Sequence, residues 1–95
     1  MMFANKIKEL REKKQMVQRQ FAAALEIDTP MYSKIERGER LTKRKQITII
    51  AQLLQANEND LVSLWVADKI IVAVGDEKEL VPQAFKAALQ KLNQK

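Results

Sequence analysis

Apolar residues recur at the spacing of an α-helix along almost the whole chain. In the N-terminal segment, Phe3, Ile7 and Leu10 fall on one stripe, with charged residues on the other faces. The same spacing returns near the C-terminus, where the stripe consists of Val81, Phe85, Ala88 and Leu92. Two glycines and two prolines in 95 residues leave little material for β-hairpins. The sequence therefore predicts an all-α fold.

Short polar residues and glycines set the ends of the expected helices. We expect helices over residues 3–14, 18–25, 29–37 and 58–74, one that carries Ile47, Ile50, Ala51 and Leu54, and a last one from Leu80 or Val81. Asp28 and Asn57 can each cap the helix that follows, and Thr42 is expected to cap the fourth. Gly38 supplies a left-handed exit from the 29–37 helix, and the 58–74 helix is expected to stop at Gly75.

The positive charge of the chain lies in its N-terminal half. The formal net charge is +5. Residues 1–45 hold 12 Lys and Arg against 6 Asp and Glu, whereas residues 46–95 hold 5 against 6. This asymmetry indicates nucleic-acid binding by the N-terminal half, although a solvated basic face explains the charge alone equally well.

Several kinds of chemistry lack the residues they need. The sequence has no cysteine and no histidine, which excludes disulfides, Cys/His zinc sites and histidine acid–base catalysis. We therefore expect no metal, no cofactor and no enzymatic activity. The longest apolar stretch, residues 61–74, is interrupted by Asp68 and Lys69 and is too short to span a bilayer. The N-terminus has no apolar signal core, so a cytoplasmic protein without a membrane partner is expected.

Two short helices, Gln18–Leu25 and Thr29–Arg37, follow each other with about three residues between them, which is a helix-turn-helix pattern. The segment "QRQFAAALEIDTPMYSKIERGER" resembles the Cro/repressor (XRE) family. The residues that carry the resemblance are Gln18, Ala22 and the run Ile35-Glu36-Arg37-Gly38. The resemblance covers roughly residues 3–64 and implies a five-helix repressor-like bundle, here with a long fifth helix and an added C-terminal helix.

Within this pattern a small residue and five large ones have structural roles. Ala22 faces the 29–37 helix, where a larger side chain would push the two helices apart. The expected core around it consists of Phe21, Leu25, Ile27, Tyr32 and Ile35. Two positions depart from the family: Val17 replaces a capping Ser or Thr, and Glu26 replaces the Gly of the turn. A left-handed Glu26 would cost roughly 1 kcal/mol.

The resemblance also implies how the chain contacts DNA, with the 29–37 helix in the major groove. The expected base-reading residues are Thr29, Pro30, Ser33 and Lys34. Lys34 can donate to guanine, and the Thr29 methyl and Pro30 offer apolar contact to thymine. The expected phosphate contacts are Gln18, Arg37, Arg40, Lys43, Arg44 and Lys45. The resemblance further implies an ion pair between Arg11 and Glu36 that holds the first helix to the third.

The 58–74 segment is more apolar than a helix that covers a small bundle requires. A homodimer would bury this surface and would present two recognition helices to half-sites about 34–36 Å apart. The expected interface consists of Leu61, Leu64, Trp65, Ile71, Val74 and Phe85. Packing of the last helix against the 58–74 helix within one chain is the alternative. We expect residues 1–66 to bind DNA and residues 67–95 to form a dimerising extension of the same globular unit.

These features favour a sequence-specific, dimeric regulator of transcription that binds a (pseudo)palindromic site in double-stranded DNA. Restriction-modification controller proteins and phage-type repressors are short members of the family, which fits an autoregulatory switch. The alternative is an interaction protein, such as an antitoxin whose C-terminal helices cover a toxin. An enzyme would need a phosphate loop, a metal cluster or a nucleophile pair beside its acidic residues, and the sequence has none of these.

Overall fold

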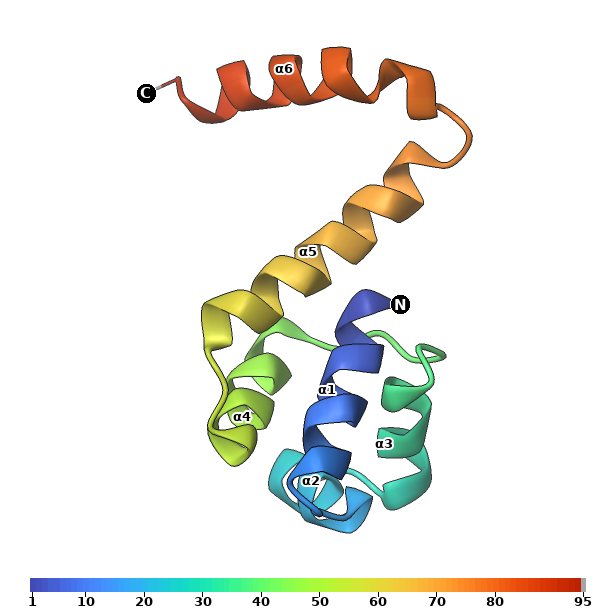
Figure 1. Cartoon of the computed structure of the whole chain (residues 1–95), viewed down its shortest axis with the longest axis vertical. Helices are drawn as coiled ribbons and strands as arrows, with labels where there is room; N and C mark the ends of the chain where they lie inside the picture. The colour runs from blue at the N-terminus through green and yellow to red at the C-terminus, as the bar shows by residue number, and fades with distance from the viewer. Residues whose placement is uncertain (95) are drawn as a thin grey trace.

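The computed structural model describes residues 1–94, and in that range it contains helices and no strand (Figure 1). The elements are α1 (Met2–Lys13), α2 (Gln18–Leu25), α3 (Thr29–Glu36), α4 (Arg44–Leu54), α5 (Glu58–Val74), the 3₁₀ helix η1 (Lys78–Leu80) and α6 (Val81–Leu92). The all-α prediction is confirmed. Lys95, which ends the expected C-terminal extension, lies outside the described residues.

Helices α1 to α4 and the first half of α5 surround one apolar core. Its fully buried large side chains are Ile7, Phe21, Tyr32, Ile35, Ile47, Ile50, Leu54 and Leu61. The rings of Phe21 and Tyr32 stack with their centroids 5.4 Å apart, which joins α2 to α3. Ala22 is 2% exposed and leaves room for this close approach. Of the five large residues expected in this core, Ile27 alone is only partly buried.

A carboxylate from α5 caps the N-terminus of α1. The backbone N–H groups of Met2 and Phe3 donate to the two carboxylate oxygens of Asp68, at 2.9 and 3.0 Å. The first N–H groups of a helix have no partner within the helix, and they carry partial positive charge. Asp68 is 6% exposed, so its carboxylate satisfies these groups inside the protein. This contact fixes α1 against α5.

Two of the three expected caps are confirmed. Asp28 accepts from the N–H of Met31 at 2.8 Å, and Asn57 accepts from the N–H of Asp60 at 3.0 Å. The prediction that Thr42 caps α4 is wrong. Helix α4 begins one residue later than such a cap allows, and the buried Thr42 presents its carbonyl to Trp65, whose Nε1–H donates to it at 2.8 Å.

A residue with positive φ follows each of the helices α1 to α4, at Gln15, Glu26, Gly38 and Gln55. Gly38 follows α3 with φ +74°, as its expected role requires. Glu26 ends α2 with φ +58°, so the turn adopts the left-handed conformation without the glycine that usually provides it. The N–H of Ile27 then bonds back to the carbonyl of Ala22 at 3.0 Å, which keeps the turn tight.

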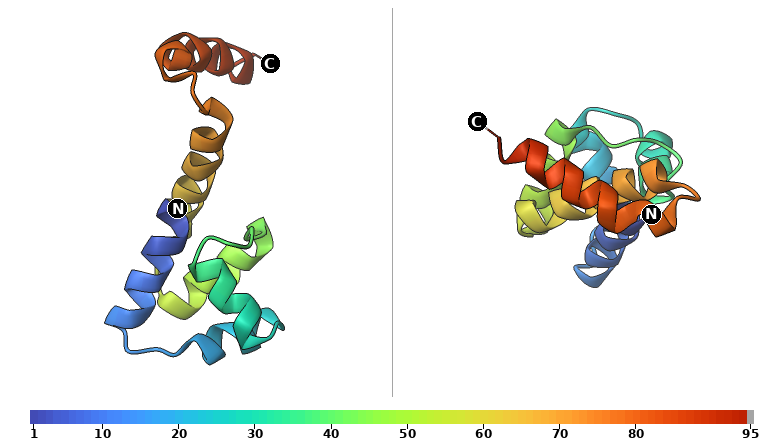
Figure 2. Two further views of the ribbon diagram at one scale, coloured as in Figure 1. Left: turned by 90° about the vertical axis from the view of Figure 1, so that its right-hand side faces the viewer. Right: turned by 90° about the horizontal axis from the view of Figure 1, so that it is seen from above.

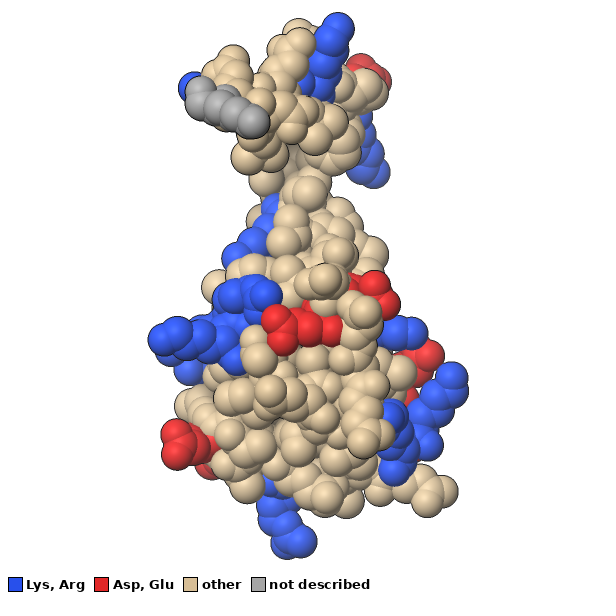
Figure 3. Space-filling view, turned by 90° about the vertical axis from the view of Figure 1, so that its left-hand side faces the viewer, with Lys and Arg blue, Asp and Glu red and all other residues tan. Residues whose placement is uncertain are grey.

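Beyond Asp68, α5 leaves the bundle as a single helix, and α6 lies across its far end (Figures 1 and 2). No residue of α5 after Asp68 is buried, and neither is any residue of α6. A narrow neck between a globular part and a small end is visible from the side (Figure 3). The described chain is therefore elongated, with extents of 43 × 30 × 23 Å.

Candidate nucleic-acid interface

Helix α3 turns one face to the core and the other to solvent. Tyr32, Ile35 and Glu36 are buried. On the opposite side, Pro30 and Lys34 are exposed, and Thr29 and Ser33 are partly buried. The four residues predicted to read bases therefore lie on the half of α3 that its own core leaves free.

The ends of α3 are set by local chemistry. Asp28 caps the first turn of α3. Pro30 lies in the same turn, where its missing backbone N–H costs no intrahelical hydrogen bond. At the other end, a Cβ atom on Gly38 would come within 2.9 Å of the Met1 Cγ atom. The positive φ and this close approach both favour glycine there. A short helix with two fixed ends can hold its side chains at defined positions.

A buried carboxylate links α3 to α1 and α2. Arg11 donates from Nε to Glu36 Oε2 at 2.7 Å and from Nη2 to Glu36 Oε1 at 3.0 Å. Gln18 donates from Nε2 to the same Oε1 atom at 3.0 Å. Arg11 also donates from Nη1 to the carbonyl of Met16 at 2.9 Å, in the connection between α1 and α2. We call Arg11, Gln18 and Glu36 the clasp, because together they join three helices.

The clasp stays charged despite its burial. Burial raises the pKa of the Glu36 carboxyl, but the hydrogen bonds from Arg11 and Gln18 outweigh this effect and leave that pKa below its ordinary value. The bond to Glu36 raises the pKa of Arg11 against the opposing effect of burial. Burial also raises the pKa of the Tyr32 hydroxyl, which has no hydrogen-bond partner among the described residues. At neutral pH the clasp is thus an ion pair beside a neutral tyrosine.

Next to the clasp lies an open hollow of about 620 Å³ between α2 and α3. It is lined by Arg11, Val17, Gln18, Arg19 and Thr29. The Arg19 guanidinium and the N-terminus of α2 border this hollow, whereas the charge of Arg11 is already paired with Glu36. A guanidinium group beside a helix N-terminus suits a phosphate group. The structure brings together Gln18, predicted to bind phosphate, and Thr29, predicted to read bases. It also adds Arg19, which was not among the predicted DNA contacts.

A family model described as Helix-turn-helix matches residues 7–61, from within α1 to the first turn of α5. The chain belongs to the helix-turn-helix family. It is a DNA-binding protein of the Cro/XRE type, as the resemblance predicted. The match ends at Leu61 and does not reach α6. No curated protein and no solved structure gives a significant match to the chain.

Two of the predicted DNA contacts bond to each other in this helix-turn-helix protein. Arg37 donates from Nη1 to the Ser33 Oγ atom at 2.6 Å and also pairs with the carboxylate of Glu39. All three side chains lie at or just after the end of α3. Ser33 can still use its hydroxyl hydrogen and a second lone pair toward a base. Arg37 would have to leave Glu39 to contact a phosphate with its whole guanidinium group.

The basic cluster that follows α3 is not uniform. Arg44 donates from Nη2 to Glu58 at 3.0 Å and from Nη1 to Thr48 at 3.3 Å, so its guanidinium group is directed at the start of α5. Arg40, Lys43 and Lys45 are exposed. Like Arg37, Arg44 thus has an acidic and a hydroxyl partner within its own chain.

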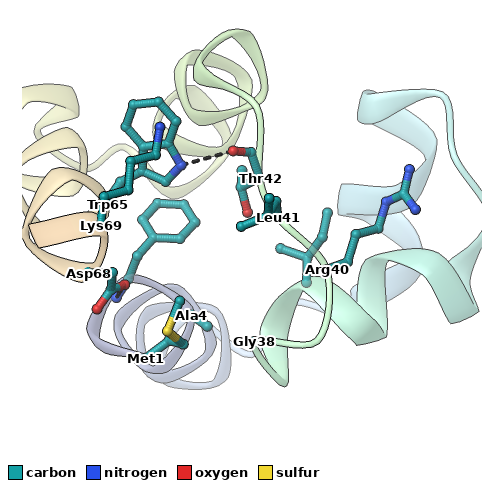
Figure 4. Close-up of a pocket in the computed structure, with 11 residues that line it drawn as sticks. Met1, Ala4, Gly38, Arg40, Leu41, Thr42, Trp65, Asp68 and Lys69 are labelled. Carbon is teal, nitrogen blue, oxygen red and sulfur yellow. Dashed lines mark hydrogen bonds between the residues drawn. The ribbon is translucent and has the colours of Figure 1, made fainter. Parts of the chain in front are cut away.

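Half of the predicted dimer interface belongs to the chain's own packing. The prediction for Leu61 is wrong, because this side chain is 2% exposed and sits in the core. Leu64 and Trp65 are partly buried and pack against that core. The Trp65 ring also lies under the Lys69 ammonium, 3.4 Å from the ring centroid (Figure 4).

The other half of that predicted interface remains available. Ile71 is 59% exposed and Phe85 is 45% exposed. Val74 is partly buried at the end of α5.

The cavity beside Trp65 is too small for a ligand. It holds about 40 Å³ and lies between α1, α5 and the loop after α3 (Figure 4). Pockets that bind small molecules have volumes of roughly 300–1,000 Å³. In residues 1–94 no group of three or more acidic side chains is placed to hold a metal ion. No helix in this range is long and apolar enough to cross a membrane.

Proposed function

We propose that this helix-turn-helix protein regulates transcription by binding a specific, (pseudo)palindromic DNA site as a homodimer, with α3 in the major groove. The observation that carries this proposal is the exposed face of α3 beside the basic hollow. A phosphate in the hollow would set the position of α3, because Arg11 and Gln18 are already fixed there by Glu36. Residues 1–66 would bind DNA, and residues 67–95 would join the two copies.

Base reading would come from Thr29, Pro30, Ser33 and Lys34. Lys34 is exposed, so its ammonium group is free to donate to guanine O6 and N7. Thr29 lines the hollow, so it lies where the groove edge and a phosphate would meet. The exposed Arg40, Lys43 and Lys45 would contact phosphates farther along the backbone. Three further predicted phosphate contacts already have hydrogen bonds to side chains of their own chain, namely Gln18, Arg37 and Arg44. On DNA binding, each would keep that hydrogen bond or replace it with one to a phosphate.

A dimer is supported by the small size of the reading face. One α3 helix offers four side chains to the bases, and each good base contact gives only about 1–3 kcal/mol of discrimination. Two copies related by a two-fold axis would read both halves of a palindrome. Autoregulation, as in a controller protein of a restriction-modification system, is the biological role that we propose, and a cytoplasmic location goes with it.

A second candidate function is supported by a different observation. The apolar surface of α6 is open, and it could cover a protein such as a toxin. The protein would then be an antitoxin that binds DNA to regulate its own operon.

The test is binding to DNA from upstream of the protein's own gene, compared with scrambled DNA, across a salt series. We expect tight binding to the upstream DNA alone. Lys34→Ala should weaken that binding by about 1–3 kcal/mol and leave scrambled DNA unaffected. Arg19→Ala should weaken binding to both DNAs and reduce the salt slope by about one. Equal, weak binding to both DNAs that disappears with salt would contradict sequence-specific recognition.

A further inference from the structure

Helix α6 carries an apolar stripe that its own chain leaves exposed. Phe85 is 45% exposed, Leu89 is 59% exposed and Leu92 is 78% exposed. No residue of α6 is buried. Charged side chains are sparse on the broad surface that runs up the neck to this end of the molecule (Figure 3). Contiguous apolar surface of this kind is unusual on a protein that stays monomeric.

The stripe borders a groove between α5 and α6. The groove has a volume of about 390 Å³ and is lined by residues of both helices. The two helices meet at an angle (Figure 1). Its apolar lining includes Ile70, Val74, Val81, Ala84, Phe85 and Ala88. Glu77 supplies the one charged side chain of the lining. The groove would therefore accept a helix that has an apolar face flanked by one positively charged side chain.

We propose that the groove receives α6 of a second copy, with the two α6 helices antiparallel around a two-fold axis. This inference rests on the homodimer proposed above and specifies its interface. The partner helix would contact both α6 and the end of α5, including Ile70 and Val74. The DNA-binding bundles would then lie at the far ends of the two α5 necks.

The order of large and small residues on α6 supports this pairing. When Val81–Leu92 pairs with itself in antiparallel fashion, the axis passes between residues 86 and 87. Phe85 then faces the partner's Ala88, and Leu89 faces the partner's Ala84. At the helix ends, Val81 faces the partner's Leu92. Each of the two largest inner side chains thus meets an alanine, which lets two helices approach closely.

The charges along residues 76–92 support the same antiparallel direction. Acidic residues precede α6 at Asp76, Glu77 and Glu79, with Lys78 between them, and the lysines of α6 lie at its middle and near its end, at Lys86 and Lys91. An antiparallel pairing places Lys91 opposite the partner's Pro82, at the end of α6 that Glu77 and Glu79 precede, whereas a parallel pairing would place like charges beside each other. Lys91 lies at the edge of the apolar stripe, so its stem can pack while its ammonium group reaches the acid.

Cysteine cross-linking tests the pairing directly, because the natural chain has no cysteine. In the double variant Val81→Cys/Leu92→Cys, the two positions are eleven residues apart on one helix, about 16 Å. They cannot form a disulfide within one chain. The proposed register brings them together between chains, so mild oxidation should yield a covalent dimer in most of the protein.

A matched control uses two other residues that also face each other across the proposed axis. Gln83→Cys/Gln90→Cys also places two residues symmetrically about the axis, but on the polar side of α6. We expect at least about tenfold less cross-linking for this variant. Light scattering on cysteine-free protein supplies a second readout. Phe85→Glu should raise the dimer dissociation constant at least about tenfold, whereas Val72→Glu, on the side of α5 away from the groove, should leave it within about twofold.

The outcomes separate this inference from the proposed function. Suppose that light scattering shows a dimer. The antiparallel α6 pairing would then be overturned if the Gln83/Gln90 variant cross-links as well as the Val81/Leu92 variant, or if Val72→Glu is the change that disrupts the dimer. The homodimer would stand in both cases. A monomer at all concentrations would overturn both the pairing and the homodimer, and it would point to a different protein as the occupant or to closure of α6 onto α5 within one chain. DNA binding by the same samples reports independently on α3.

Discussion

Helices α3 and α6 are both amphipathic, and they differ in what their apolar faces meet. Tyr32 and Ile35 of α3 are no more than 1% exposed, because α1 and α2 pack against α3. Leu89 and Leu92 of α6 have the same helical spacing and remain largely exposed. Periodicity therefore identifies an apolar face without identifying its partner. For α3 the free side is polar and is the face that we propose to contact DNA, whereas for α6 the free side is apolar and is the face that we propose to pack against a second copy.

The largest effect is expected where the bundle buries charge. Arg11→Ala should lower the free energy of unfolding by about 3–5 kcal/mol, because Glu36 would be left charged and unpaired in the interior. Urea denaturation followed by circular dichroism measures this. Arg44→Ala removes an exposed ion pair with Glu58 and should cost less than about 1 kcal/mol. Equal effects of the two substitutions would show that the clasp does not hold the bundle.

A pair of leucines tests the contrast between the buried core of the bundle and the exposed helix α6. Leu54 is fully buried in α4, so Leu54→Ala should cost about 2–5 kcal/mol. Leu92→Ala, on α6, should change the stability of the dilute monomer by less than about 0.5 kcal/mol. The measurement is urea denaturation at a protein concentration below the dimer dissociation constant. A large loss for Leu92→Ala at that dilution would mean that α6 packs within its own chain.

The cap that Asp68 provides for α1 is expected to have an intermediate effect. Asp68→Ala should cost about 0.5–2 kcal/mol, because the N–H groups of Met2 and Phe3 would lose their acceptor. Faster amide hydrogen exchange at the start of α1 should accompany the loss. Glu9→Ala removes an exposed carboxylate from the same helix and should have almost no effect. Unchanged exchange in Asp68→Ala would contradict the capping role.

The smallest expected effect is a pH dependence that only the clasp produces. The pKa of Glu36 is lowered in the folded protein, so the stability from this group is present above its ordinary value of 4.5. That stability is lost as the pH falls through the lowered value. Wild-type protein should therefore lose more stability than Glu36→Gln between pH 5 and the acid limit of folding. Parallel stability curves for the two proteins would exclude Glu36 as the source.

Features that depend on neighbouring residues could be predicted from the sequence. The helices, the caps at Asp28 and Asn57, and the glycine exit at Gly38 follow from local rules, and the structure has them. Thr42 shows the limit of such rules. A residue with good capping chemistry was recruited into the interior, where its carbonyl accepts from Trp65.

Contacts between distant segments were harder to predict. The cap on α1 joins residues 65 and 66 positions apart, and no local pattern connects them. The one available signal was Asp68 itself, a carboxylate within an apolar stretch. Leu61 was assigned to a dimer interface because an apolar face does not reveal which of its residues belong to the core. Arg19 became a candidate only when the structure placed it in the hollow beside Gln18.

We propose that α3 reads bases and that α6 joins two copies. Selection of DNA sites from a random pool tests this most directly. The full-length protein should enrich an inverted repeat of one half-site, since two α3 helices would read one DNA. Phe85→Glu should enrich the same half-site without the repeat, because α3 is unchanged and the pairing is lost. An unrepeated site for the wild-type protein, or no enriched sequence at all, would contradict the account.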